Sequence, residues 1–180
     1  MLLKAVFSSL SLSVLAASLA LPSYAQETTP RTKVCAPVSE EKISSLFDRW
    51  NQSLATLDPV EVAANYSKSA VLLPTISNTP RTTPEKIKDY FVEFLQQRPQ
   101  GVINERTITL GCNKASDVGI YTFTLHNENG EAIEASARYS YVYVYENGQW
   151  LIAHHHSSLM PEVAATSEVD IKEQYYSKPI

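Results

Sequence analysis

Cysteine, glycine and charge are all scarce in this chain of 180 residues. With 2 cysteines, 5 glycines and 19% charged residues, the composition excludes a dense disulfide scaffold, a collagen-like repeat and a disordered polyelectrolyte. Basic residues are outnumbered by acidic ones, 15 to 19, so the chain lacks the positive surplus that holds a phosphate backbone and nucleic acid is not an expected partner. The 44% of hydrophobic residues is typical of one globular domain.

A single long hydrophobic run stands at the start of the chain. Lys4 precedes an apolar stretch over residues 5–21, and Pro22-Ser23-Tyr24-Ala25 follows with small residues at the −3 and −1 positions. This order is typical of a secretory signal peptide cleaved after Ala25. The run is interrupted by serines, whereas a membrane-spanning helix needs about 20 continuous apolar residues. We therefore expect an exported protein, periplasmic or secreted, that keeps no membrane attachment after cleavage.

Export changes how the two cysteines are interpreted. Cys35 and Cys112 both lie beyond the cleavage site, and an even number of cysteines in an oxidising compartment favours a disulfide. Neither has another Cys or His two to four residues away, as a zinc site requires. We expect Cys35 and Cys112 to be bonded to each other.

The chain divides into four segments. Residues 1–25 are the expected signal peptide, residues 26–38 a polar and flexible leader, residues 39–161 the folded domain, and residues 162–180 an acidic tail with a short helix near 168–175. Apolar residues at helical spacing predict a helix over 39–56, a second one beginning at Asp58-Pro59 with Tyr66 on its buried face, and a third from Thr83 to Pro99.

Beyond Gly101 the apolar pattern changes to a period of two, which predicts strands. Asn129-Gly130 and Asn147-Gly148 mark hairpin turns. Helices followed by antiparallel strands indicate an α+β fold with the helices on one face of a curved antiparallel sheet. The predicted strands are 70–73, 102–110, 118–126, 132–145 and 149–157.

The order of these elements resembles a known family. The segments LFDRWNQSLATLDPVEVAANYSKSAVLLPTISN and ENGQWLIAHHHSSLMPE are similar to the association domain of calcium/calmodulin-dependent protein kinase II, in the form of stand-alone, exported bacterial proteins of the SnoaL-like, nuclear-transport-factor-2-like superfamily. The resemblance covers about residues 39–161. It implies a cone-shaped barrel whose sheet wraps on about three N-terminal helices, and self-association into a homodimer or larger. It implies neither kinase activity nor calmodulin binding, because the chain has no kinase domain.

Three consecutive histidines stand in the last predicted strand. Under strict alternation His154 and His156 share a face with Trp150 and Ile152, while His155 lies on the opposite face with Ser157. We expect no metal, because the only other histidine is His126 and no acidic residue stands at a recognisable ligand spacing. Packing, an interface and a ligand-facing role all remain open for these imidazoles.

The preceding strand carries a row of tyrosines on one face, opposite Arg138. Such a row can line a cavity or form an oligomer interface, and both readings remain open. In the related kinase domain, arginines in a pocket inside the cone hold small carboxylates; matching on the shared Gly-x-Trp turn puts Tyr141 and Ser157 at two of those positions. Because this chain lacks those arginines, the pocket would be less positive, and we expect a neutral or aromatic ligand rather than a small carboxylate. The tyrosines are Tyr139, Tyr141, Tyr143 and Tyr145.

These patterns lead to a functional hypothesis with two alternatives. We expect a small-molecule-binding, self-associating module with no cofactor and no assignable reaction, whose ligand contacts are Tyr141, His155, Ser157 and Arg138. The first alternative is an isomerase or cyclase acting on a small carbonyl compound, with His155 as base and Tyr141 as hydrogen-bond donor. The second is a purely structural oligomer with a filled cone. We expect assembly through the outer strand face, because the aromatic strands offer more surface than the helices would bury.

Overall fold

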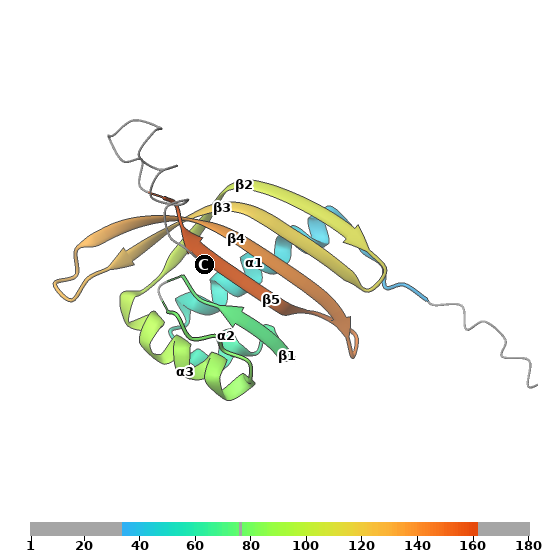
Figure 1. The fold of residues 1–180 in the computed structure, drawn as a ribbon, viewed down its shortest axis with the longest axis horizontal. Coiled ribbons are helices and arrows are strands. Elements are labelled where there is room, and N and C mark those ends of the chain that lie inside the picture. Colours follow the sequence, from blue (N-terminus) through green and yellow to red (C-terminus); the bar gives the residue numbers. More distant parts are fainter. Residues whose placement is uncertain (1–33, 76, 162–180) are drawn as a thin grey trace, which may run out of the picture. The chain divides into compact units, whose positions relative to one another are not determined.

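The computed structural model describes residues 34–75 and 77–161, and Figure 1 shows their arrangement. The predicted signal peptide, most of the predicted leader and the predicted helix near 168–175 lie outside these residues. Three α-helices, one short 3₁₀ helix and five strands make up the described part of the chain. The α+β class predicted from the sequence is confirmed.

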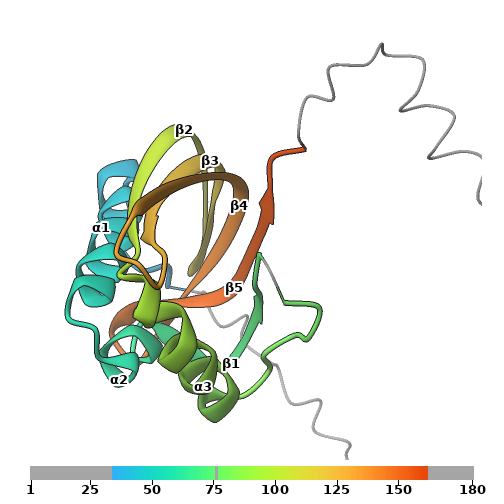
Figure 2. The ribbon, with the colours of Figure 1, turned by 90° about the vertical axis from the view of Figure 1, so that its left-hand side faces the viewer.

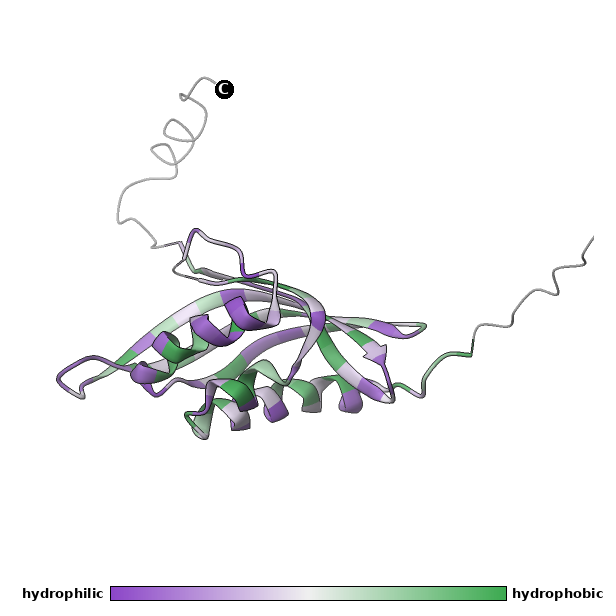
Figure 3. Ribbon diagram, turned by 90° about the horizontal axis from the view of Figure 1, so that it is seen from below, coloured by the Kyte–Doolittle hydropathy of each residue, from purple (hydrophilic) through white to green (hydrophobic). Residues whose placement is uncertain are grey.

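Helix α1, Glu40–Ala55, begins where the sequence predicts. The Ser39 hydroxyl accepts a hydrogen bond from the backbone N–H of Lys42 and thereby caps the helix, and two glutamates occupy the positive first turn. Polar and apolar residues alternate along the helix as purple and green bands in Figure 3. Its apolar stripe is buried, and consists of Ile43, Leu46, Phe47, Trp50 and Leu54.

Helix α2, Pro59–Ala63, is a single short turn capped by Asp58, whose carboxylate accepts from the Val60 N–H at 2.8 Å. The prediction that Tyr66 belongs to the buried face of this helix is wrong. Tyr66 is the first residue of strand β1, Tyr66–Leu73, which is longer than predicted. The helix stops because the chain pairs with β5 there, a long-range contact that local spacing does not reveal.

Helix α3, Pro84–Phe94, is capped by the Thr83 hydroxyl, which accepts from the Lys86 N–H. It continues into the 3₁₀ helix η1, Leu95–Gln97, and ends at Arg98, which adopts a left-handed conformation with φ 46°. The helix therefore ends close to the predicted boundary. Its buried side chains, Ile87 and Phe91, turn toward the sheet.

The five strands form one mixed sheet in the order β1-β5-β4-β3-β2. β1 pairs in parallel with β5, whereas the other neighbours are antiparallel. The sheet is therefore mixed, and not antiparallel throughout as expected. It does not close into a barrel, and β1 and β2 are its edge strands. The remaining strands are β2 (Gln100–Gly111), β3 (Lys114–His126), β4 (Ala132–Glu146) and β5 (Gln149–Leu159).

The turn between β4 and β5 confirms the predicted hairpin. Asn147 and Gly148 both have positive φ, 50° and 84°. Two such residues in succession match the right-handed twist of the flanking strands, which is why Asn-Gly is favoured there. This turn fixes the pairing of Glu146 with Gln149 and hence the start of the register between the two strands.

The curved sheet encloses the core against the helices, which lie along its concave side in Figure 2. The aromatic row predicted on β4 faces inward, because Tyr139, Tyr141 and Tyr143 are all buried and Tyr145 is partly buried against the core. Trp50 on α1 contacts this row edge-on at 5.9 Å from the Tyr141 ring. Burying one large side chain of this kind stabilises the fold by about 1.5–3 kcal/mol.

A bulge in β5 overturns the strict alternation expected for the histidines. Tyr143 pairs with Ile152 but the next residue back, Val142, pairs with His154, so Ala153 is an extra residue. An inserted residue reverses the facing of every side chain after it. Trp150, Ile152, His155 and Ser157 are therefore buried on one face, and His154 and His156 are half-buried on the other.

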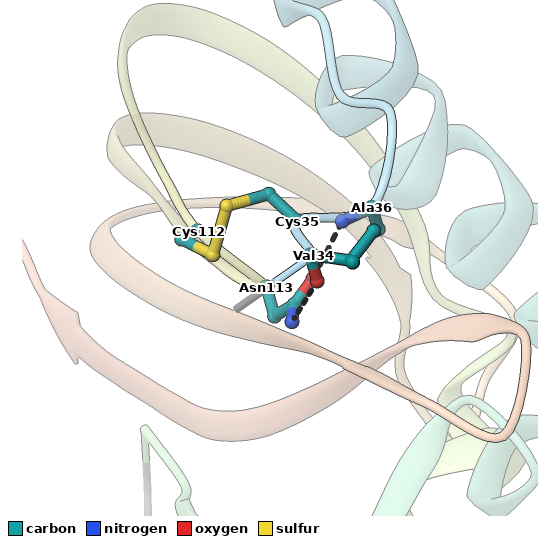
Figure 4. Close-up of a disulfide and its surroundings, with 5 residues drawn as sticks. All are labelled: Val34, Cys35, Ala36, Cys112 and Asn113. Carbon is teal, nitrogen blue, oxygen red and sulfur yellow. Dashed lines mark hydrogen bonds between the residues drawn. A yellow bond between two sulfur atoms is a disulfide. The ribbon is translucent and has the colours of Figure 1, made fainter. Parts of the chain in front are cut away.

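The predicted disulfide joins the segment before α1 to the loop between β2 and β3 (Figure 4). The Cα atoms of Cys35 and Cys112 are 4.9 Å apart, within the range that a disulfide bridges. The Asn113 side chain reinforces this junction, because its amide oxygen accepts from the Ala36 N–H at 2.7 Å and its amide nitrogen donates to the Val34 carbonyl. The bond closes a loop of 77 residues, which the chain-entropy model values at about 4 kcal/mol.

Candidate functional site

A small cavity of about 70 Å³ lies between α3 and the inner faces of β3, β4 and β5. Aromatic and aliphatic side chains form most of its wall. The side chains in the wall that carry polar atoms are Trp50, Thr75, His155, Ser157 and the tyrosines, and among the described residues no Asp, Glu, Lys or Arg lines it. The lining is Trp50, Leu72, Pro74, Thr75, Tyr90, Phe91, Phe94, Tyr121, Phe123, Leu125, Ala135, Ala137, His155, Ser157 and Leu159.

His155 is the ionisable group in this wall whose ordinary pKa lies nearest to neutral pH. Its ring is 4% exposed, stacks on Tyr141 with 4.2 Å between ring centroids and meets the Trp50 ring edge-on. Burial lowers the pKa of His155 to about 3, with a smaller contribution from the charges of His154 and His156. The imidazole is therefore neutral at physiological pH, and its Nδ1 is hydrogen-bonded to the Tyr66 hydroxyl at 2.9 Å.

A second polar group in the wall is a pair of hydroxyls. The Thr75 side chain, from the segment that follows β1, donates to the Ser157 hydroxyl on β5. Tyr121 on β3 adds its phenol to the same wall, and burial raises the pKa of Tyr121 above its ordinary value. All three groups are uncharged near neutral pH and can bind only through hydrogen bonds.

The four predicted ligand contacts are not brought together. His155 and Ser157 line the cavity. Tyr141 is fully buried beneath the His155 ring and is not part of the wall. Arg138 is exposed on the outer face of β4, where its guanidinium reaches the Leu159 carbonyl at 3.5 Å, so the same alternation that buries Tyr139 and Tyr141 keeps it out of the cavity.

Several wall residues were not singled out from the sequence. Tyr90, Phe91 and Phe94 belong to the apolar stripe of α3, and Tyr121 and Phe123 to the inner face of β3. Their spacing predicts burial, but the same spacing suits a filled core and a cavity wall. Thr75 gives no such signal, because it follows a proline in a polar segment.

A buried ion pair lies elsewhere on the inner face. Asp117 is fully buried, and the Arg106 Nε is 3.1 Å from Asp117 Oδ2. The Tyr139 hydroxyl donates to Asp117 Oδ1 at 2.8 Å. Burial raises the pKa of Asp117, while the bonds from Tyr139 and Arg106 oppose this effect. None of these three residues lines the cavity, so we assign them to the stability of the fold.

No cluster of three or more histidine, cysteine or carboxylate side chains suited to a metal ion occurs in residues 34–75 and 77–161. His154 and His156 lie two residues apart on the outer face of β5, and their cross-strand neighbours on β1 are Val71 and Leu73. The apolar neighbours supply no further ligand.

Comparison with known proteins identifies related folds. Residues 39–161 match the family model described as calcium/calmodulin dependent protein kinase II association domain. A crystal structure described as such an association domain, from Xanthomonas campestris, is 48% identical, with 71% of this chain and 91% of that chain covered and a TM-score of 0.68.

More distant structures share the fold alone. A Caulobacter vibrioides protein with a cystatin-like fold is 15% identical over 73% of this chain and 96% of its own, with a TM-score of 0.58. A Salmonella enterica protein of the nuclear transport factor 2-like superfamily is 17% identical over 71% of this chain and 94% of its own, with a TM-score of 0.59. Among curated proteins no match was found. Because the family model matches residues 39–161 and the Xanthomonas relative is 48% identical, the chain belongs to the calcium/calmodulin dependent protein kinase II association domain family.

Proposed function

We propose that this protein is an exported, self-associating module that binds a small uncharged molecule in the cavity beside α3. The observation that carries the binding proposal is the composition of the cavity wall: it joins aromatic rings with a few neutral hydrogen-bonding groups. Ligand sites typically have this makeup, an apolar wall with a small number of placed polar groups. A charged ligand in a cavity with such a wall would lose its hydration without gaining a partner of opposite charge.

The size of the cavity limits the ligand. An engineered protein cavity of about 150 Å³ holds benzene, whereas this one measures about 70 Å³. The ligand therefore has only a few non-hydrogen atoms in the cavity. It is either very small or the end of a longer molecule that leaves past Leu159, which is 48% exposed.

The properties of His155 favour binding over the isomerase or cyclase alternative. A general base works best when its pKa is near the working pH, and burial holds the pKa of His155 at about 3. Such an imidazole accepts a proton from substrate poorly. The open volume beside it also speaks against the alternative of a completely filled cone.

Butan-1-ol and butanoate provide a matched test, because they differ chiefly in charge. We expect butan-1-ol at ten times its dissociation constant to raise the free energy of unfolding by about 1.4 kcal/mol, and butanoate to have no effect at the same concentration. Urea unfolding with and without each compound measures this. Stabilisation by butanoate alone would contradict the proposal.

Self-association is proposed on the family relationship and on the outer face of the sheet. The expectation that aromatic strands cover this face fails, because the tyrosines of β4 point inward. The outer face instead carries half-buried aliphatic side chains beside the two outer histidines, and Val118 is 37% exposed there. An aliphatic patch of this kind suits contact with a second copy. Its members are Val71, Leu73, Val118, Ile120, Val142, Val144, Leu151, His154 and His156.

Val142→Lys is expected to disrupt this association. Val142 stands between Ser116 and His154 at the centre of the outer patch, so a lysine there would be buried unpaired in the dimer. We expect the dissociation constant to rise at least tenfold in sedimentation equilibrium. Val92→Lys on α3, where the valine is 49% exposed, is the matched control. A dimer unaffected by Val142→Lys would remove the outer face from the proposal.

Export is proposed from the N-terminal pattern and is supported by the disulfide, because such bonds persist in oxidising compartments. Within the described residues, no helix is long and apolar enough to cross a membrane. We expect the exported protein to begin at Gln26 and to contain no free thiol. Intact-mass measurement with and without reduction checks both points, and a mass that includes residues 1–25 would contradict cleavage.

A further inference from the structure

The two nitrogens of His155 have different surroundings. Nδ1 is bonded to the Tyr66 hydroxyl at 2.9 Å, and Tyr66 is not among the residues that line the cavity. Nε2 is buried and has no hydrogen-bond partner among the described residues. The His155 ring lines the cavity, and Nε2 is the nitrogen of this ring whose hydrogen-bonding capacity is unused among the described residues.

The Tyr66 hydroxyl determines which nitrogen carries the proton. A neutral imidazole has one N–H and one acceptor nitrogen, and burial keeps His155 neutral by lowering its pKa to about 3. Within the described residues, His155 Nδ1 is the hydrogen-bond partner of the Tyr66 hydroxyl. If Nδ1 carried the proton, both the phenolic proton and the Nε2 lone pair would lack a partner among the described residues, whereas donation by Tyr66 leaves one group, the Nε2–H, unpaired. We therefore assign the donor role to Tyr66 and the imidazole proton to Nε2.

We infer that His155 is a fixed hydrogen-bond donor that selects a ligand with an uncharged carbonyl oxygen. This inference rests on the proposed function and narrows its ligand class. A buried N–H without an acceptor is costly, so a ligand that supplies one is preferred over a ligand of the same shape that does not. Tyr66 is then a positioning residue, because it acts on the ligand only by holding the His155 ring in one tautomer.

The tautomer can be measured directly on the full chain. In a ¹⁵N NMR spectrum of histidine side chains, we expect His155 to show an unprotonated Nδ1 and a protonated Nε2, unchanged between pH 5 and 8. Tyr66→Phe removes the phenolic donor and should produce a mixture of tautomers. Tyr139→Phe, which alters a phenol bonded to Asp117 and leaves His155 untouched, is the matched control. A native spectrum with the proton on Nδ1 would overturn the inference.

Recognition is tested with two probes of nearly equal shape, 2-butanone and 2-methylbut-1-ene, which exchange a carbonyl oxygen for a methylene group. Because the alkene leaves water more readily than the ketone, the quantity compared is the ketone-to-alkene affinity ratio in the native protein and in His155→Phe. We expect this ratio to be roughly tenfold higher in the native protein, the worth of one hydrogen bond, while the alkene still binds to His155→Phe. An equal ratio in the two proteins would overturn the selection by His155 and leave the proposed function standing. Binding of neither probe would overturn the proposed function as well.

Discussion

Replacing Arg106 with methionine is expected to lower the free energy of unfolding by about 3 kcal/mol. Asp117 is fully buried and its carboxylate is held by Arg106 and Tyr139. Breaking a buried pair from one side costs about 3–5 kcal/mol, since an uncompensated charge stays behind. We take the lower end because the Arg106 side chain is 24% exposed and Tyr139 still donates to the carboxylate.

The pH dependence of this loss of stability shows whether it comes from the unpaired charge of Asp117 or from the lost packing of Arg106. Burial raises the pKa of Asp117 above its unfolded value. The folded state therefore binds more protons than the unfolded state between those two values, and stability falls as pH rises through them. Removing Arg106 raises the folded pKa further. The loss of stability in Arg106→Met should thus be small at pH 3.5, where the Asp117 carboxyl is mostly protonated in the folded and the unfolded state. It should reach its full size at pH 7.

Urea unfolding at both pH values measures the effect. Lys86→Met, at an exposed position on α3, is the matched control and should change stability little. The double variant Arg106→Met with Asp117→Asn should recover much of the loss, because no buried charge remains. A deficit of equal size at pH 3.5 and pH 7 would show that lost packing of Arg106 on the Phe47 ring, 5.8 Å away, is responsible instead.

Ala137→Leu is expected to abolish ligand binding, with an affinity loss of at least about a hundredfold. Ala137 is 3% exposed, lies on the inner face of β4 opposite Tyr121 and lines the cavity. The added carbon atoms would take up much of the roughly 70 Å³ available. Overpacking typically costs about 1–3 kcal/mol of stability, so the fold should survive.

Isothermal titration with butan-1-ol on the variant and the native protein measures this loss. Ala132→Leu provides the matched control, because Ala132 is exposed on the same strand and does not line the cavity. Unchanged affinity in Ala137→Leu would place the ligand somewhere else on the protein.

Features set by local chemistry could be predicted from the sequence. Ser39, Asp58 and Thr83 cap the three helices because a side-chain oxygen can satisfy a free N–H of the first turn. Asn147-Gly148 forms the hairpin for an equally local reason, the tolerance of positive φ. The cysteine pair was inferred from compartment and number rather than from geometry.

Features set by long-range pairing could not be predicted. The bulge at Ala153 depends on how β4 and β5 are held together, and three identical histidines give no sign of where the alternation breaks. Tyr66 belongs to a strand only because β1 pairs with β5. Arg138 was included as a substitute for the arginines that the related domain has in its pocket, although its alternation with Tyr139 pointed outward. The cavity depends on the distance between α3 and the sheet. The pattern of apolar residues along the chain does not determine that distance.

Amide NMR spectra recorded while butan-1-ol is added test whether an uncharged molecule occupies the cavity beside α3. We predict saturable shifts at Phe94, Ala137, His155 and Ser157, which line the cavity, and none with butanoate. Shifts confined to the outer face of the sheet, or equal saturation by butanoate, would contradict binding of an uncharged molecule in this cavity.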